Sequence, residues 1–332
     1  MARMPVTLVT GTSTGIGFAT ALHLARHGHR VVATMRNLAK AGPLEAAARR
    51  ESLPLTVREL DVTRQDSIDG AVAATRAREG AIDVLVNNAG IGGATPLELT
   101  PEAEHRAMFE ANYWGPIRMI HAVLPSMRER RAGCIVNVTS IAGRVATPNQ
   151  IPYSASKHAL AAVSEALAHE VAAFGIRVAI IEPGVIQTAI FENSAGATRY
   201  DKASPYRQIM RRNGKLFAAG FRNPGKPETV AAAILDAITT DRPRLRYLVG
   251  VDAEGLAAGR ARISDEAWVA MGGPLSDEEY NARFKRYFGI DLQPLTVAPH
   301  PVAPHPVAPH PALSPEGRGC GDFPLPGGER AG

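Results

Sequence analysis

The sequence predicts an α/β protein: a doubly wound parallel sheet of about seven strands with helices on both faces. Short runs rich in β-branched residues alternate with Ala-rich helical patterns along the chain. The β-branched runs are almost continuously apolar, which is typical of strands buried on both faces. Right-handed crossovers between such strands produce a doubly wound sheet.

The expected strands are residues 6–10, 30–35, 55–61, 83–87, 134–139, 177–182 and 246–249, and the expected helices lie near 16–27, 65–79, 101–129, 153–174 and 227–239. The segment 189–225 differs, because it mixes aromatic and polar residues with poor periodicity. Such a stretch indicates a lid over a ligand or irregular surface. Residues 277–288 form an amphipathic helix, and we favour core packing over a substrate wall for its aromatic stripe.

The end of the chain has an unusual composition. The pentapeptide Val-Ala-Pro-His-Pro occurs three times from residue 297, and a Pro/Gly-rich stretch follows to residue 332. Frequent proline removes backbone donors, and few large apolar side chains remain to be buried. We therefore expect one domain at residues 1–291, with the lid at about 189–225, and a disordered tail at 292–332. Because the tail would not hold its recurring histidines together, no metal site is expected.

Composition excludes several classes of protein. The formal net charge is +5, yet the arginines are scattered and no nucleic-acid-binding motif accompanies them. No apolar stretch is long enough to cross a membrane, and the chain enters a strand without a secretory signal region. The two cysteines make no disulfide framework, and Cys134 is expected to be a small buried apolar residue. These features predict a cytoplasmic protein that binds neither nucleic acid nor membrane.

A glycine-rich turn follows the first strand and opens a helix. It reads Thr10-Gly11-Thr12-Ser13-Thr14-Gly15-Ile16-Gly17. A turn of this kind lets the backbone approach a pyrophosphate, whose charge then lies at the positive end of the helix. The alternative is a tight turn that needs glycine only for its positive φ angles.

A tyrosine, a lysine and a serine form the second candidate constellation. Tyr153 and Lys157 are four residues apart on a predicted helix, so both side chains lie on one face. A phenol is a poor base at neutral pH, but a nearby ammonium, or an oxidised nicotinamide, lowers its pKa. Ser140 ends the strand 134–139, at the sheet edge where ligands bind. Ser140 and Tyr153 could therefore converge on one carbonyl oxygen.

With these motifs the chain resembles the short-chain dehydrogenase/reductase family, in its single-domain branch with a Rossmann fold. The glycine turn matches that family's Thr-Gly-x-x-x-Gly-x-Gly motif. The other matching positions are Asn87-Asn88-Ala89-Gly90, Asn112, Ser140, Tyr153, Lys157, Pro183-Gly184 and Thr188, in order over residues 4–250. A shorter match at residues 31–37 is similar to 17β-hydroxysteroid and retinol dehydrogenases, which suggests a hydrophobic substrate.

The resemblance implies roles for these residues. Tyr153 exchanges a proton with the substrate oxygen, and Ser140 holds that oxygen by a hydrogen bond. Lys157 binds the nicotinamide ribose and lowers the pKa of Tyr153, and Asn112 holds a water that relays protons through Lys157. The expected cofactor contacts come from the glycine turn (11–17) and from Arg36, Asp61, Val62, Asn87, Asn88, Ala89, Gly90, Tyr153, Lys157, Pro183, Gly184, Val185 and Thr188.

The end of the second strand predicts which cofactor is preferred. NAD is selected by an acidic residue there, which binds the ribose 2′-hydroxyl. Met35 occupies that place and Arg36 follows it. A guanidinium pairs with a 2′-phosphate, and no carboxylate is present to repel it. NADP is therefore predicted, with NAD possible; the alternative is that Arg36 is only a solvated loop residue.

Two further expectations concern function and assembly. A runner-up function is a catalytically silent protein that senses NAD(P) and regulates, although this chain retains every catalytic position. Members of the family usually dimerise through the helices near 101–129 and 153–174. A homodimer or homotetramer is therefore expected, and an Ala-rich face at Ala155, Ala159, Ala162 and Ala166 would permit close approach.

Overall fold

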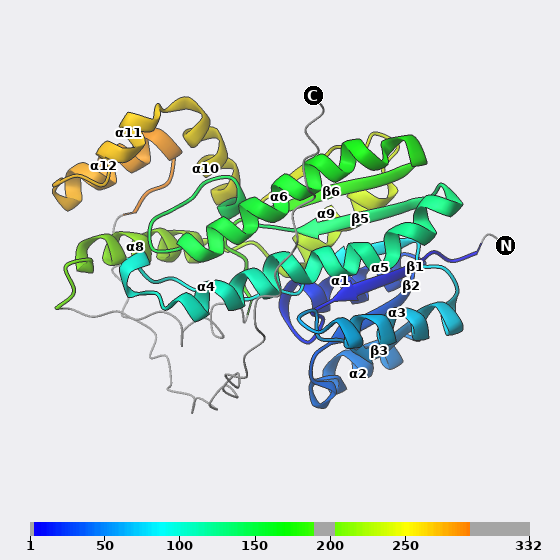
Figure 1. The fold of residues 1–332 in the computed structure, drawn as a ribbon. Helices are drawn as coiled ribbons and strands as arrows, with labels where there is room; N and C mark the ends of the chain where they lie inside the picture. Colours follow the sequence, from blue (N-terminus) through cyan, green and yellow to red (C-terminus); the bar gives the residue numbers. More distant parts are fainter. Residues whose placement is uncertain (1–2, 189–202, 293–332) are drawn as a thin grey trace, which may run out of the picture. The chain divides into compact units, whose positions relative to one another are not determined.

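The computed structural model describes residues 3–188 and 203–292. Seven strands form one sheet in the order β3-β2-β1-β4-β5-β6-β7, and every neighbouring pair is parallel. The strands are β1 (Val6–Thr10), β2 (Arg30–Met35), β3 (Leu55–Glu59), β4 (Val84–Asn87), β5 (Gly133–Val138), β6 (Ile176–Pro183) and β7 (Arg246–Val249) (Figure 1). The predicted doubly wound fold is confirmed, with strand ends that shift by one or two residues.

Helices bury both faces of this sheet. On one face lie α1 (Gly15–Arg26), α2 (Gly42–Arg50) and α9 (Pro227–Thr239); on the other lie α3 (Gln65–Glu79), α5 (Gly115–Arg130) and α6 (Ile151–Val171). Val9 packs with the first group and Leu8 with the second, as the alternation of side chains along a strand requires. Cys134 is buried in the first group, as expected.

A third apolar cluster lies beyond β7. It is built from α8 (Arg207–Arg222), α10 (Val251–Arg262), α11 (Asp265–Ala270) and α12 (Asp277–Phe288). A capping box between Ser276 and Glu279 begins α12, which matches the helix predicted at 277–288. Its aromatic residues Tyr280, Phe284 and Phe288 are buried in this cluster. The stripe is therefore core packing.

One expectation about helices is confirmed in extent but with a local irregularity, and another was wrong. The helix expected at 101–129 consists of α4 (Glu102–Phe109), a π-helical segment (Glu110–Trp114) and α5. Residues 207–222, read from the sequence as poorly periodic, form the helix α8. Its apolar residues Ile209, Met210, Leu216 and Phe217 recur at helical spacing, so the amphipathic pattern is present in the sequence and was missed.

The predicted domain boundaries remain predictions. Residues 1–296 group into one compact unit by their contacts. Residues 189–202 of the expected lid and 293–332 of the expected tail lie outside the described residues. Within the described ranges, no helix is both long and apolar enough to cross a membrane.

Candidate active site

The predicted site residues gather at one edge of the sheet, where the strands have their carboxyl ends. The glycine turn follows β1, Arg36 follows β2, Asp61 follows β3 and Asn88 follows β4. Ser140 follows β5, and Gly184 follows β6. The strand order reverses between β1 and β4, which is where open α/β sheets bind their ligands.

The glycine turn leaves no room for side chains. Gly11 and Gly15 have φ angles of 72° and 60°, which favour glycine. A Cβ on Gly11 would lie 2.8 Å from the Ala89 Cα, and one on Gly17 would meet the Gly11 carbonyl oxygen. Gly17 is not among the positive-φ glycines. Close approach, and not φ alone, therefore requires glycine here.

Two polar side chains hold this turn from beneath. The Thr10 hydroxyl accepts the backbone N–H groups of Asn88 and Ala89, both at 3.0 Å. The Asn88 side-chain amide donates to the carbonyls of Thr10 and Gly11. Thr12 is fully buried, and its hydroxyl donates to the Thr34 carbonyl. Of the expected cofactor contacts, Thr12 is therefore not exposed to a ligand, since its backbone N–H also donates to the Thr34 carbonyl, at 2.9 Å.

The start of α1 fits the pyrophosphate of a dinucleotide. Thr14 precedes α1 without capping it by its side chain, and the first turn contains no acidic residue. The first backbone N–H groups of a helix are unpaired, and they favour an anion. Ser13 and Ile16 are half-buried beside them. Thr188 reaches the same place from the β6 loop, since its Cβ lies 3.1 Å from where a Gly15 Cβ would be.

The loops after β2 and β3 would receive the adenosine end. Met35 is buried, and Arg36 is exposed at the sheet edge. One Asp61 carboxylate oxygen accepts the backbone N–H and the hydroxyl of Thr63, which fixes the turn. Val62 is buried against Gly115 at the start of α5. No acidic residue occupies the end of β2, so this edge fits a 2′-phosphate.

The acid/base candidates converge on one position, where Lys157 is buried and Tyr153 is half-buried. Tyr153 and Lys157 both belong to α6, and the Lys157 Nζ lies 5.8 Å from the centre of the Tyr153 ring. Lys157 is buried, and its ammonium donates to the Val138 carbonyl at 3.0 Å. The Ser140 side chain lies close enough to Tyr153 to influence its pKa, while the Ser140 Oγ accepts the Ala142 N–H at 3.1 Å and donates to the Pro183 carbonyl at 3.4 Å. The three residues predicted from spacing therefore form one cluster.

Burial changes the pKa of both titrating groups. It lowers the pKa of Lys157 to about 8. It raises the pKa of Tyr153, and the nearby Ser140 hydroxyl offsets only part of that increase. The lowered Tyr153 pKa expected from Lys157 is therefore not found in the protein alone, because loss of solvation outweighs the other effects. The positive charge of an oxidised nicotinamide would act in the expected direction.

Asn112 lies in the π-helical segment, a type of helix defect frequent at functional sites. Its side chain accepts the Ile91 N–H at 2.8 Å and donates to the Ile91 carbonyl and the Ser156 hydroxyl. The Ser156 hydroxyl donates in turn to the Tyr153 carbonyl. Asn112 thus joins the loop after β4 to the catalytic helix. Its expected role in holding a water remains a prediction.

The Asn87 side chain is turned into the core. Its amide donates to Asn137, which donates to the Ser164 hydroxyl on α6. A cofactor contact by this side chain is therefore not supported by its position. Gly90, in contrast, lies beside the site: a Cβ there would be 2.9 Å from the Asn112 Oδ1 and 3.6 Å from the Lys157 Nζ.

Strand β6 ends at Pro183, and the loop after it contains Gly184, Val185 and Thr188. The Gly184 N–H donates to the Val249 carbonyl at 2.9 Å, and the Val185 N–H donates to the Asp252 carboxylate at 2.7 Å. Sequence reasoning missed Asp252, which follows the loop by more than sixty residues. No motif marks it, and only the topology brings α10 against this loop.

Comparison with known proteins agrees with the site. The family model described as short chain dehydrogenase matches residues 5–198. The 3-ketodihydrosphingosine reductase of Bacteroides thetaiotaomicron is 36% identical over 74% of this chain and 87% of its own. Retinol dehydrogenase 8 of Bos taurus is 39% identical, with 74% and 82% covered. Human 17-beta-hydroxysteroid dehydrogenase type 1 is 36% identical, with 74% and 77% covered.

Solved structures share the fold. A short-chain dehydrogenase from Streptomyces avermitilis has a TM-score of 0.71 and 38% identity, covering 82% of this chain and 99% of that one. A gluconate 5-dehydrogenase from Burkholderia cenocepacia, in complex with NADP and tartrate, has a TM-score of 0.64 and 25% identity, covering 75% and 94%. The predicted resemblance is confirmed, including its retinol and 17β-hydroxysteroid dehydrogenase branch. The chain belongs to the short-chain dehydrogenase family and is an NAD(P)-dependent oxidoreductase that acts on CH–OH groups.

Proposed function

We propose that this protein moves a hydride between NADP(H) and the carbonyl or secondary alcohol of a hydrophobic small molecule, with Tyr153 as the acid/base. One observation carries the proposal. Ser140, Tyr153 and Lys157 form a single cluster at the sheet edge, with the serine beside the tyrosine and the buried lysine Nζ 5.8 Å from the centre of the tyrosine ring. A catalytically silent protein that only senses NAD(P) would not need this arrangement of side chains.

Each residue has a defined part in the reaction. When bound, the nicotinamide supplies or accepts the hydride. The Tyr153 hydroxyl gives its proton to the carbonyl oxygen in reduction and takes the proton back in oxidation. Ser140 donates a hydrogen bond to the same oxygen and stabilises the charge that develops there. Lys157 provides a buried positive charge that favours the phenolate form of Tyr153. Asn112 holds α6 and the β4 loop in register.

The preference for NADP rests on the end of β2. The buried Met35 leaves no carboxylate there, and the exposed Arg36 guanidinium is available to a 2′-phosphate. The gluconate 5-dehydrogenase that shares this fold is described as an NADP complex. Use of NAD remains open as the weaker alternative.

The substrate class rests on the relatives and on the surface near the site. Retinol, 17β-hydroxysteroids and 3-ketodihydrosphingosine, which name three relatives, are largely apolar alcohols or ketones. In this chain Ile91 and Ile151 are both about two-fifths exposed, at 40% and 42%. Ile91 follows Gly90, and Ile151 begins the catalytic helix α6. Exposed apolar side chains beside a polar cluster are suited to an apolar substrate.

A substrate screen with one variant tests the proposal. NADPH and NADP should be supplied with a panel of ketones and secondary alcohols that ranges from short polar to long apolar compounds, and reduced cofactor should be followed by absorbance. Tyr153→Phe keeps the ring and loses the exchangeable proton, so turnover should fall by about 10² or more while NADPH still binds. Full turnover in this variant would contradict the assignment. Cofactor binding without turnover of any compound would favour the sensing alternative.

A second pair of variants tests the cofactor preference. A charge-assisted contact between Arg36 and a 2′-phosphate contributes ~1.5–3 kcal/mol. Arg36→Ala should therefore raise KM for NADP by about one to two decades at low salt and leave NAD almost unaffected. Met35→Asp should reverse the preference. Equal losses for both cofactors in Arg36→Ala would mean that the arginine only supports its loop.

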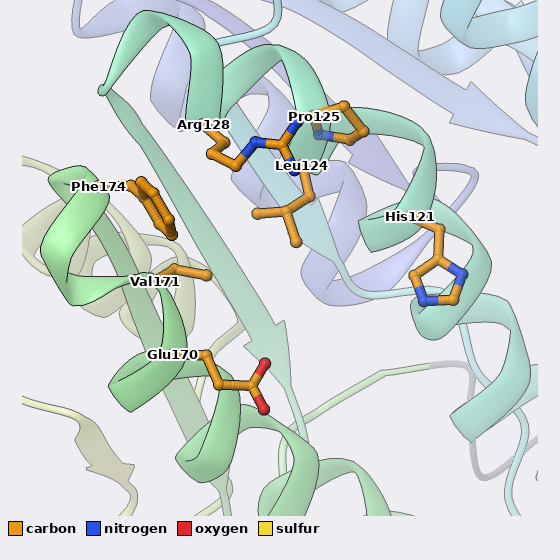
Figure 2. Close-up of a pocket in the computed structure, with 7 residues that line it drawn as sticks. All are labelled: His121, Leu124, Pro125, Arg128, Glu170, Val171 and Phe174. Atoms are coloured by element: carbon orange, nitrogen blue, oxygen red, sulfur yellow. The ribbon is translucent and has the colours of Figure 1, made fainter.

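We also propose assembly through α5 and α6. A hollow of about 460 Å³ lies between these helices, lined by His121, Leu124, Pro125, Arg128, Glu170, Val171 and Phe174 (Figure 2). On α6, Ala162 and Ala166 are exposed, whereas Ala155 and Ala159 are half-buried. A second copy could bury both features. Light scattering of the wild type and of Ala162→Glu tests this: a monomeric wild type would contradict it.

The cytoplasmic location remains a prediction from the sequence.

A further inference from the structure

Asp252 forms close contacts with the loop that follows β6, although no sequence motif marks this residue. Its Oδ2 accepts the Val185 N–H at 2.7 Å. Its Cγ lies 2.5 Å from where a Gly184 Cβ would be, so a side chain at position 184 would collide with the carboxylate. Gly250, whose φ is 115°, lies close to the same carboxylate: a Cβ at this position would be 2.8 Å from the Asp252 Oδ1. Only glycine at both positions lets Asp252 reach the loop.

The loop is held on its other side as well. The Gly225 N–H donates to the Val185 carbonyl at 2.9 Å, and the Gln187 N–H donates to the Gly225 carbonyl at 2.9 Å. Three residues after Val185, Thr188 contacts the glycine turn at Gly15. The position of Thr188 against the cofactor turn therefore depends on two anchors: backbone pairing with Gly225 and the carboxylate of Asp252.

We propose that Asp252 is the positioning residue of the nicotinamide-binding loop, and that its carboxylate holds residues 183–188 in the geometry required for the nicotinamide half of the cofactor. This inference rests on the proposed function, since it assigns that loop to the nicotinamide. Asp252 touches neither cofactor nor substrate. It acts through the Val185 backbone, at the end of β6 opposite the adenosine-binding loops of β2 and β3.

The electrostatics of Asp252 give this role a pH dependence. Burial raises the pKa of its carboxyl, and hydrogen bonds from the backbone of Val185, Ala253 and Asp252 itself lower it in part. All three groups that hold it are backbone amides, so no second titrating side chain shares its proton. A neutral carboxyl accepts these hydrogen bonds more weakly than a carboxylate does. Acidification should therefore loosen the loop at a higher pH than an exposed aspartate would allow.

Two probes separate the nicotinamide half from the rest of the cofactor. NADPH contains the nicotinamide, and 2′-phospho-ADP-ribose lacks it but keeps the pyrophosphate and the 2′-phosphate. Their dissociation constants should be measured by calorimetry for the wild type, Asp252→Asn, Asp252→Ala and the control Glu254→Gln. Glu254 lies in the same first turn of α10 but is exposed.

Asp252→Ala should weaken NADPH by about tenfold, the size expected for one charge-assisted hydrogen bond. It should leave 2′-phospho-ADP-ribose within about twofold. Asp252→Asn keeps the shape without the charge, so its dissociation constant for NADPH should equal that of the wild type at acidic pH and should no longer change with pH there. Glu254→Gln should behave as the wild type.

Several outcomes would overturn the inference. Unchanged NADPH affinity in both Asp252 variants would show that Gly225 suffices to hold the loop. Equal losses for the two probes would mean general damage to the fold, and an acidic limb that persists in Asp252→Asn would mean that another group titrates. A wild type that binds neither probe would instead refute the proposed function itself. Asp252→Asn changes only one atom, so it keeps the test valid if Asp252→Ala does not fold.

Discussion

The two parts of the sheet edge provide for function in different ways. After β1 and β4, the groups offered to a ligand are backbone atoms, and the polar side chains of Thr10, Thr12 and Asn88 point beneath the turn to hold it. After β5, the groups assigned to the reaction are the side chains of Ser140 and Tyr153, and the buried Lys157 lies beside them. Under the proposed function, the first region would recognise the cofactor by shape, whereas the second would perform chemistry by altered protonation.

Opposite kinds of substitution should therefore disrupt the two regions. A backbone cradle is damaged when atoms are added, because a new Cβ must displace the main chain. A buried side-chain cluster is damaged when a functional group is removed, because nothing else supplies the proton or the hydrogen bond. This contrast can be tested with single small substitutions.

Removing one hydroxyl oxygen from the site after β5 should cause the largest loss of turnover. Ser140→Ala deletes the donor to the substrate oxygen, and turnover should fall by about 10² or more while cofactor affinity changes little. Ser154→Ala is the matched control, because the buried Ser154 hydroxyl has no hydrogen-bond partner among the described residues. Its removal should leave kcat unchanged. A similar loss in both variants would show that the helix start, and not the hydroxyl, is sensitive.

Adding one carbon to the backbone region should have the next largest effect. In Gly17→Ala the new Cβ would meet the Gly11 carbonyl oxygen and lie 2.5 Å from the Asn88 Nδ2. Overpacking of this kind costs ~1–3 kcal/mol, and NADPH affinity should fall by about tenfold or more. The control Gly70→Ala adds the same carbon on the exposed side of α3, where nothing lies within 4 Å. It should stabilise the fold by ~0.5–1 kcal/mol. Normal NADPH affinity in Gly17→Ala would contradict the cradle.

The contrast also explains what the sequence could predict. The strands and the glycine turn follow from local rules, since burial on both faces and positive φ angles leave direct signatures in composition. Helix α8 was missed because residues 189–225 were read as one irregular segment, although Ile209, Met210, Leu216 and Phe217 recur within it at helical spacing. Asp252 was not predicted because its proposed role depends on a contact with Val185, which is distant in the sequence. The Tyr153 pKa was misjudged because spacing reveals a neighbouring charge but not the loss of solvent.

The pH dependence of the side-chain region should show the smallest change. Burial lowers the pKa of Lys157 to about 8 from its ordinary value of 10.5. Only the charged form favours the phenolate of Tyr153, so kcat/KM should fall by up to about tenfold as the pH rises through about 8. Lys157→Met should have lower activity throughout and should lack this limb.

Stability should move in the opposite direction over the same range, which separates loss of charge from unfolding. Between pH 8 and 10.5 the unfolded chain keeps the Lys157 proton that the folded protein has released. The unfolded state then binds more protons, so the contribution of Lys157 to stability increases with pH. Melting temperatures of the wild type and Lys157→Met between about pH 8 and 9.5 measure this contribution by difference. A fall in both activity and this difference would mean that the limb reports alkaline unfolding and not the charge beside Tyr153.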